Sequence, residues 1–531
     1  MKHPTYFVTL LAAGVFLAGC DGDDGMNGMD GSDGADGLNS LVATRDIPKG
    51  DAVCLGGGLA LDSGLDTNRN DVLDAGEVTS TELLECAATP LIRALHASPD
   101  APAVNIWVNG ATALTDVDYA QGSGFLPVVE ENVVQVEAIT PAGNAVVIDA
   151  DVNLDYSTEA SIIAVNTVAD GIRALPVINN SDERIREGYF RAQVVHASPS
   201  APPVDVYVTE LGADLLASAP VNGAMTPLAF ESFTGRVEVP AGAYQIRITV
   251  AGDATKTAVF DSGEIDLPAG ADLMIVAIEN VGPGDTPVQL IVLDGAAATQ
   301  LNDVNTPASV VAVHLSPDAP AVDILADVNG TAVNEAIALV RNVSFGEFCD
   351  LNGVPAPGDY TISIAENADN SIVRLQFPLV VDQGDEATAI VSGFLSSGTT
   401  AITALPLAGD TRSIFTETKL RITHGSPSTP DVDLYLVPAG TDISDAMVTP
   451  SFAAVPFGAS TPMLSIANGT YDAIVTLQGS KTAAIELLGL NFAGGEVLDV
   501  IARDPNIDGS EGTLPLPLVI DYSAVPACPA P

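Results

Sequence analysis

The sequence predicts an all-β protein: a tandem array of four immunoglobulin-like β-sandwich domains, preceded by a disordered spacer and a small disulfide and calcium module. Two observations predict this class. Four of the five histidines open one phrase, His-x-Ser-Pro-x-x-Pro-x-Val-Asp/Asn, at His96, His196, His314 and His424. Successive histidines are separated by about the length of one domain, which is typical of repeat arrays. Hydrophobic residues make up 47 % of the chain, and 48 Gly and 36 Pro supply the frequent turns of β domains.

The first residues predict export and a lipid anchor. Lys2 and His3 precede an apolar stretch at 5–18, which is too short to span a membrane. The closing Leu-Ala-Gly-Cys resembles a bacterial lipoprotein signal, which implies that the signal peptide 1–19 is removed and that Cys20 is lipidated; ordinary secretion is the alternative. We expect the mature protein to lie in the cell envelope, at the outer membrane or cell surface. Asp21 resembles an inner-membrane retention signal, so the inner membrane is the alternative location.

Residues 20–38 form a spacer with glycine at every third position from Gly22 to Gly37. No proline occupies these triplets, so we expect a flexible acidic tether, with collagen-like trimerisation as the alternative. The whole chain carries 69 acidic against 19 basic residues. This balance argues against nucleic acid and anionic lipid surfaces as partners.

Residues 39–88 form a small module bounded by Cys54 and Cys86, and its loop 66–77 resembles the twelve-residue calcium loop. The predicted Ca²⁺ ligands are Asp66, Asn68, Asn70, the carbonyl of Val72, Asp74 and Glu77. Position six, normally Gly, is Asp71, a residue type that tolerates the left-handed conformation. An Asp/Asn-rich turn without an ion is the alternative.

With Cys20 lipidated, four cysteines remain in an exported chain, which favours disulfides. Cys54 and Cys86 are the natural local pair. Cys349 with Cys528 then follows by elimination, with two free thiols as the alternative.

The four sandwiches are predicted at 91–182, 191–297, 310–409 and 419–524, and polar linkers near residues 179–190, 298–308 and 408–418 separate them. Each begins with a strand that ends at Ser-Pro and continues into a second strand with period-two aliphatic residues. Three copies then carry Gly-x-Tyr before another strand, which is typical of a tyrosine corner. We expect these domains to be joined end to end as a rod.

The phrase His-Ala-Ser-Pro-Asp-Ala-Pro-Ala-Val-Asn at 96–105, with its three variants, resembles the opening motif of the domain of unknown function 4397 family of bacterial exported and envelope proteins. The resemblance covers residues 91 to about 524. It implies a β-sandwich outside the cytoplasm and carries no established activity.

The phrase fails the requirements of a Ser-His-Asp triad. Asp100 and Asp318 become Ser200 and Ser428 in the other copies, and a serine followed by proline lacks the sharp elbow of a nucleophile. We therefore predict no enzyme and a bracing role for each His-Ser pair. These pairs are His96 and Ser98, His196 and Ser198, His314 and Ser316, and His424 and Ser426.

Trp107, Tyr207 and Tyr435 occupy equivalent positions, where exposed aromatic rings would stack on sugars. The predicted function is a non-catalytic, lipid-anchored envelope or surface protein acting in adhesion, matrix attachment or envelope structure. Its partners would be the membrane, through the anchor, and a glycan or extracellular matrix protein. A glycan or small-ligand receptor is the alternative, and a hydrolase is a remote one.

Overall fold

The computed structural model describes residues 37–181, 183–223, 226–328, 337–351, 356–396 and 400–529. The predicted signal peptide, Cys20 and nearly all of the spacer lie outside these ranges. The chain divides into two compact units, Met1–Cys86 and Ala87–Pro531. Within the described ranges, the only helical segment is the 3₁₀ turn η1 (Leu215–Ala217), and no helix has the length and apolar character needed to cross a bilayer.

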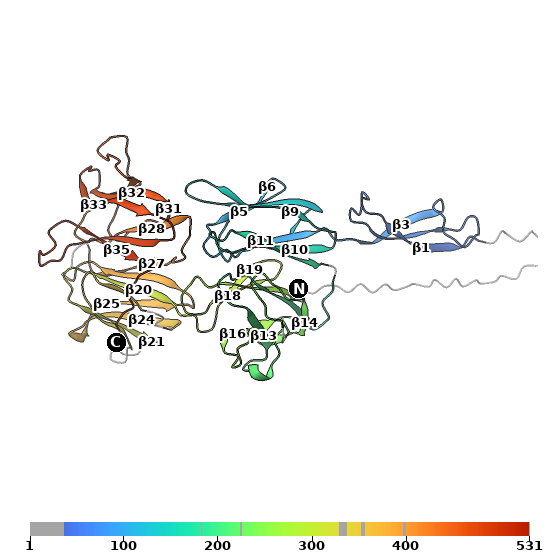
Figure 1. Ribbon diagram of the computed structural model, residues 1–531, viewed down its shortest axis with the longest axis horizontal. Helices are drawn as coiled ribbons and strands as arrows, with labels where there is room; N and C mark the ends of the chain where they lie inside the picture. The colour runs from blue at the N-terminus through green and yellow to red at the C-terminus, as the bar shows by residue number, and fades with distance from the viewer. Residues whose placement is uncertain are drawn as a thin grey trace, which may run out of the picture. The chain divides into compact units, whose positions relative to one another are not determined.

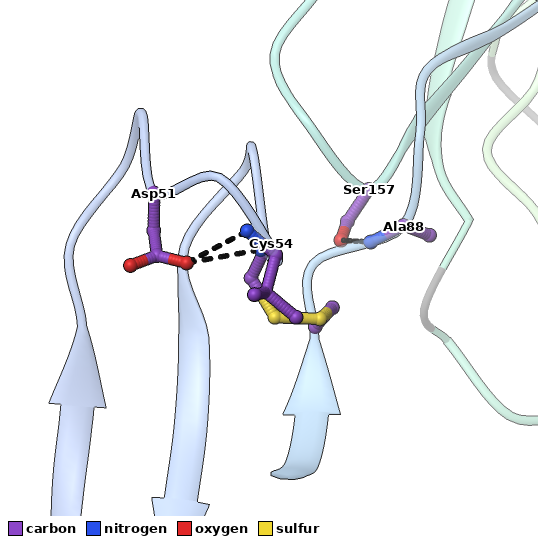
Figure 2. The surroundings of a disulfide bond; sticks show 6 residues. Asp51, Cys54, Ala88 and Ser157 are labelled. Carbon is purple, nitrogen blue, oxygen red and sulfur yellow. Dashed lines mark hydrogen bonds between the residues drawn. A yellow bond between two sulfur atoms is a disulfide. The ribbon is translucent and has the colours of Figure 1, made fainter.

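The first unit is one antiparallel sheet of order β1-β2-β3, formed by β1 (Ser40–Ile47), β2 (Gly58–Leu65) and β3 (Val78–Cys86). Its core is small and consists of Ile47, Cys54 and Ala60 packed on Cys86. The Cys54–Cys86 disulfide cross-links this sheet, and nearby Asp51 Oδ1 accepts the N–H of Val53 at 2.8 Å and that of Cys54 at 3.4 Å (Figure 2). A sheet this small depends on such a cross-link.

The second unit contains four sandwiches, here called repeats 1 to 4, each made of two sheets (Figure 1). The first sheet of repeat 1 has the order β11-β10-β4-β7 and contains β4 (Leu91–His96), β7 (Leu126–Pro127), β10 (Thr158–Val165) and β11 (Arg173–Asn180). Its second sheet has the order β6-β5-β8-β9 and contains β5 (Val104–Val108), β6 (Ala111–Val117), β8 (Glu131–Ala138) and β9 (Ala145–Asn153).

Repeat 2 has sheets of order β14-β12-β17-β18-β19 and β13-β15-β16. The first contains β12 (Tyr189–His196), β14 (Val237–Pro240), β17 (Asp272–Glu279), β18 (Val288–Leu293) and β19 (Ala298–Leu301); the second contains β13 (Val204–Thr209), β15 (Gly242–Val250) and β16 (Ala258–Leu267). Strand β19 lies in a segment predicted as linker, because it continues the sheet by pairing with β18.

Repeat 3 has sheets of order β23-β20-β26-β27 and β22-β21-β24-β25. The first contains β20 (Ser309–Leu315), β23 (Phe348–Asp350), β26 (Glu386–Ser392) and β27 (Thr403–Ala408); the second contains β21 (Val322–Val328), β22 (Ile337–Val343), β24 (Gly358–Glu366) and β25 (Asp369–Val381).

Repeat 4 has sheets of order β31-β28-β34-β35 and β30-β29-β32-β33. The first contains β28 (Glu417–His424), β31 (Leu464–Ala467), β34 (Val497–Arg503) and β35 (Leu516–Asp521); the second contains β29 (Val432–Pro438), β30 (Phe452–Val455), β32 (Gly469–Leu477) and β33 (Ala483–Phe492).

The strand that carries each motif histidine runs parallel to a later strand of the same sheet, in the pairs β4·β10, β12·β17, β20·β26 and β28·β34. Two of the Gly-x-Tyr elements form tyrosine corners, since Tyr244 Oη donates to Pro240 O at 2.8 Å and Tyr360 Oη to Ala356 O at 2.6 Å. The predicted all-β class with repeated sandwiches is confirmed.

Repeats 1 and 2 pack on each other through the outer faces of their first sheets. Strand β10 shows why: Ile162 points into the core of its own sandwich, whereas the next residue, Ile163, joins a buried cluster shared with repeat 2. The members of that cluster that are at most 1 % exposed include Leu95, Ile163 and Val177 from repeat 1 and Val195, Val276 and Leu293 from repeat 2.

Repeats 3 and 4 pair in the same way. Val313, Leu315 and Ile390 of repeat 3 share a buried cluster with Ile501 and Ile520 of repeat 4. The expected end-to-end rod is therefore wrong within each pair. The first sheets are apolar on both faces, so each repeat needs a neighbour beside it.

The segment between repeats 3 and 4 connects the two pairs. Arg412 Nη1 donates to Ala101 O in repeat 1 at 2.8 Å, and its Nη2 pairs with Asp118. Three residues on, Phe415 N donates to Asp100 O at 2.8 Å. This linker is thus held on the motif turn of repeat 1.

Candidate functional site

The motif histidines are the last residues of β4, β12 and β28 and the penultimate residue of β20, and all four are at most 1 % exposed. Each ring Nε2 lies on the carbonyl oxygen of the second motif proline: 3.0 Å for His96 and Pro102, 3.2 Å for His196 and Pro202, 3.2 Å for His314 and Pro320, and 3.1 Å for His424 and Pro430. The ring therefore closes the Pro-x-x-Pro turn back onto the strand.

The protonation state of these rings follows from their partners. Ser98 N donates to His96 Nδ1 at 3.3 Å, and Ser316 and Ser426 make the same bond at 3.3 and 3.4 Å. Because Nδ1 accepts, Nε2 carries the proton and donates to the prolyl carbonyl. Burial lowers the pKa of all four rings, that of His96 to about 4, so they are neutral at pH 7. In repeat 2, His196 Nδ1 has no hydrogen-bond partner.

An aromatic ring meets each histidine edge-on. The centroid separations are 6.2 Å to Tyr119, 6.4 Å to Phe230, 6.4 Å to Phe345 and 6.3 Å to Phe457. Sequence reasoning missed these aromatic partners, which lie between 23 and 34 residues after their histidines. Each aromatic ring forms an apolar wall beside its histidine, whose Nε2 bonds to a carbonyl in all four repeats and whose Nδ1 accepts an amide in three of them.

The motif serines donate their hydroxyl protons away from the histidines. Ser98 Oγ donates to Asn166 O at 2.5 Å and Ser316 Oγ to Gly393 O at 2.6 Å, whereas the acceptors in repeats 2 and 4 are carboxylates. The hydrogen bonds between these serines and histidines come from the serine backbone N–H. A Ser-His-Asp triad needs the opposite arrangement, with Oγ donating to a ring nitrogen.

A carboxylate bonds across each motif turn, but it comes from the turn itself in repeats 1 and 3 and from the opposite segment in repeats 2 and 4. In repeat 1, Asp100 Oδ1 accepts the N–H of Val168 at 2.8 Å; in repeat 3, Asp318 Oδ1 and Oδ2 accept those of Leu395 and Ser396 at 2.8 and 3.1 Å. In repeats 2 and 4 the turn residue is serine, and the carboxylate comes instead from the last residue of the neighbouring parallel strand β17 or from the residue that follows β34.

That carboxylate is Glu279 in repeat 2, where Ser198 Oγ donates to it at 2.5 Å and Ser200 Oγ also donates to it. Asp504 takes the same place in repeat 4, accepting from Ser426 and, at 2.8 Å, from Ser428 Oγ. The equivalent positions in repeats 1 and 3 are Asn166 and Gly393, both left-handed with φ of 76° and 99°. That conformation is open to Asn and Gly.

The predicted calcium loop folds around its first and last carboxylates. Asp66, 1 % exposed, accepts the N–H of Asn70 at 3.0 Å and of Asp71 at 2.9 Å. Glu77, 7 % exposed, accepts Thr67 N at 2.8 Å, and hydrogen bonding led by the Thr67 hydroxyl lowers its pKa. Asp71 has φ of 57°, the left-handed conformation expected at position six.

The middle of the loop gathers three more of the predicted ligands. Asn68 and Asn70 both donate Nδ2 to Asp74 Oδ2, at 2.7 and 3.0 Å, and Val72 N donates to Asn70 Oδ1 at 2.8 Å. Nowhere in the described ranges do three His, Cys, Asp or Glu side chains form a group able to hold a metal. The donor set of this loop is mixed, with carboxamide and carboxylate oxygens, as hard cations accept.

The prediction that three exposed aromatic rings stack on sugars is wrong for two of the three residues. Tyr207 is 1 % exposed and Tyr435 is 2 % exposed, so neither ring is available for stacking on a sugar. Lys256 Nζ lies 5.0 Å from the Tyr207 ring and Lys481 Nζ lies 4.9 Å from the Tyr435 ring. Trp107 is half-buried.

Cys349 and Cys528 form a second disulfide, with a Cα–Cα distance of 4.8 Å. It joins β23 of repeat 3 to the segment after β35 of repeat 4.

An open hollow of about 550 Å³ lies where the motif turns of repeats 1 and 2 meet the linker. Pro99 and Asp100 line one side, Pro199 and Ser200 another, and Arg412 a third. Sequence reasoning did not anticipate it, because it exists only once the repeats pair.

A family model described as a domain of unknown function, DUF4397, matches residues 90–207, 212–325 and 308–435. A second domain of unknown function, DUF7151, matches residues 39–84. The DUF4397 matches end within β29, so the fourth repeat is matched only in its opening strands.

Two solved structures show distant likeness. The product complex of the multi-modular glycogen-degrading pneumococcal virulence factor SpuA is 14 % identical, covering 76 % of this chain and 37 % of its own, with a TM-score of 0.14. The N-terminal four Ig domains of Dscam1 isoform 4.4 are 12 % identical, covering 78 % of this chain and 98 % of that one, with a TM-score of 0.09. At these TM-scores neither supports an argument. No curated protein matches the chain.

Proposed function

The chain belongs to the DUF4397 family, and from that membership and its repeated sandwich fold we propose a non-catalytic cell-envelope protein, lipid-anchored through Cys20, that acts in adhesion, matrix attachment or envelope structure. The observation that carries this proposal is the state of the motif residues. Every motif histidine and serine is at most 1 % exposed and bonded within its own repeat. Residues held in this way brace a fold and leave surfaces elsewhere for partners.

The anchor is tested by metabolic labelling with palmitate. Wild-type protein should be labelled and Cys20→Ala should not, with Cys54→Ala as the control that keeps its label. Continued labelling of Cys20→Ala would overturn the anchor. Binding is tested by a screen of the mature protein against matrix proteins and glycans. Saturable binding to a matrix protein supports adhesion, and binding to glycans alone favours a receptor.

The hollow between repeats 1 and 2 favours a second candidate, a small-ligand receptor. Its volume of about 550 Å³ falls within the range typical of ligand pockets. A compound bound there should lose affinity when Ser200→Trp fills the hollow. The same ligand should bind unchanged to Trp107→Ala, because Trp107 does not line the hollow. The opposite pattern would place a glycan on the half-buried Trp107.

We also propose that Ca²⁺ stiffens the N-terminal module, held by Asp66, Asn68, Asn70, the Val72 carbonyl, Asp74 and Glu77. The left-handed Asp71 and the two buried end carboxylates support this site. An ion there would cross-link the two ends of the loop through Asp66 and Glu77.

Calorimetry of calcium into the mature chain should give a Kd on the order of 0.1 to 1 mM, as for extracellular modules. Glu77→Gln should weaken binding at least about tenfold, because it removes the closing carboxylate. Glu85→Gln, an exposed change on β3 of the same sheet, is the matched control. Identical flat titrations of wild type and Glu77→Gln would remove the site.

A further inference from the structure

The disulfide Cys349–Cys528 closes a loop of unusual extent. The two cysteines are 179 positions apart, and the loop between them contains the rest of repeat 3 and all of repeat 4. Cys349 is 6 % exposed and packs in the core of repeat 3, with Cys528 against it. The bond therefore ties the segment after one sandwich into the interior of its neighbour.

Backbone hydrogen bonds reinforce this junction. Asp350 N donates to Pro526 O at 2.9 Å, and Cys528 N donates to Asp350 O at 2.8 Å, so the segment around Ala527 pairs in parallel with the edge strand β23. Repeat 4 thus contributes an extra piece of strand to the first sheet of repeat 3.

Buried polar contacts across the same pair add to the junction. The Thr388 hydroxyl in repeat 3 bonds to Tyr522, whose Oη donates to Asp499 Oδ2 at 2.6 Å. Arg421 makes a two-pronged pair with that carboxylate at 2.8 and 2.6 Å. Repeats 1 and 2 also share a buried face, but residues 87–348 contain no cysteine.

From this arrangement we infer that the Cys349–Cys528 bond shields repeat 4 and the part of repeat 3 after Cys349 from tension. Repeats 1 and 2 and the strands β20, β21 and β22 of repeat 3 precede the bond and bear the load. When the chain is pulled from its two ends, tension reaching Cys349 crosses the sulfur–sulfur bond to Cys528. Residues 350–527 are outside the load path, so this pull does not extend them. They add to the length of the chain only after the bond is reduced.

The biological value of such a latch rests on the proposed role of the chain as an anchored adhesion or matrix protein. In an anchored chain under tension, the bond would limit the length gained to the residues outside the 350–527 loop. A reducing environment would remove that limit and let this loop extend as well.

The test is single-molecule force extension of the mature chain, with handles at residues 39 and 531. A loop of 179 positions extends by about 600 Å at roughly 3.5 Å per residue, so Cys349→Ala with Cys528→Ala should lengthen the fully unfolded chain by that amount. The matched control is Cys54→Ala with Cys86→Ala, whose separation of 32 should add only about 110 Å.

If the double variant does not fold, the same comparison is made on wild-type molecules before and after adding a thiol reductant, which should add both lengths. Equal lengths with and without the Cys349–Cys528 bond would overturn the latch. This measurement needs no binding partner or membrane, so its failure is distinguishable from failure of the proposed adhesion function.

Discussion

In repeat 2 the carboxylate bonded to the motif turn is Glu279, and replacing it tests how much this bond stabilises the turn. Glu279→Ala removes the acceptor of the Ser198 hydroxyl, which is completely buried and donates to Glu279 at 2.5 Å. It also removes the acceptor of Ser200. A hydrogen bond to a charged group contributes about 1.5–3 kcal/mol, and a buried hydroxyl left without a partner costs about 1–3 kcal/mol. These two figures describe one effect, so we expect the free energy of local unfolding around the turn to fall by about 2–3 kcal/mol.

Amide hydrogen exchange on the whole mature chain is the suitable assay, because a chain of several domains does not unfold in a single step. The amides of residues 196–201 should exchange about 30 to 150 times faster in Glu279→Ala, which is the expected free energy expressed as an equilibrium factor. Glu264→Ala, on β16 of the same repeat, is the control, since Glu264 is exposed. It should leave these amides unchanged.

A rescue variant makes the test specific. Ser200→Asp combined with Glu279→Asn copies the arrangement of repeat 1, where Asp100 accepts from Val168 N and Asn166 is left-handed. Protection at residues 196–201 should return to within about 1 kcal/mol of wild type. Exchange in Glu279→Ala that matches the Glu264→Ala control would refute the reasoning.

Three further predictions follow from the same contacts. Burial holds the pKa of His96 at about 4 against an ordinary 6.5, so the unfolded chain binds the proton first and repeat 1 should lose about 3 kcal/mol between pH 6.5 and 4; an NMR titration of this ring near 6.5 would contradict this. Leu293→Ala, at a fully buried position between repeats 1 and 2, should cost about 2–5 kcal/mol and speed proteolysis of both repeats, whereas exposed Leu488→Ala should not. Arg412→Ala should raise hydrogen exchange at Phe415 N, which bonds to repeat 1, and unchanged exchange there would show that the arginine does not hold the linker.

The strands and the sandwich class were predictable from sequence because they follow from short-range patterns. Proline stops each motif strand, and aliphatic residues alternate after it. The disulfide of Cys54 with Cys86 followed from proximity in the chain. The left-handed Asp71 was predictable for the same reason, since its conformation is set by the loop around it.

The pairing of repeats was not predicted, although its signal is present. Strand β17 contains Leu273–Ile278, six buried residues in a row, which is the pattern of a strand covered on both faces. Period-two reasoning assigns only one face to a core. The partner of the second face lies in another repeat, and sequence spacing carries no information about it.

The buried tyrosines and the exchanged carboxylates were missed for a related reason. Tyr207 and Tyr435 are covered by lysines that lie 49 and 46 positions away, on segments with no pattern of their own. Glu279 and Asp504 become meaningful only through the parallel register that sets them beside the motif turn. Side-chain partners separated by about 80 residues are brought together only by the pairing of the strands in the sheet.

The outer face of every first sheet is apolar and is buried only by the neighbouring repeat. A chain of this kind should therefore gain or lose repeats two at a time. Removing a single repeat would expose the apolar outer face of the repeat beside it, and an exposed apolar face promotes aggregation. Relatives of this protein should therefore carry even numbers of such repeats.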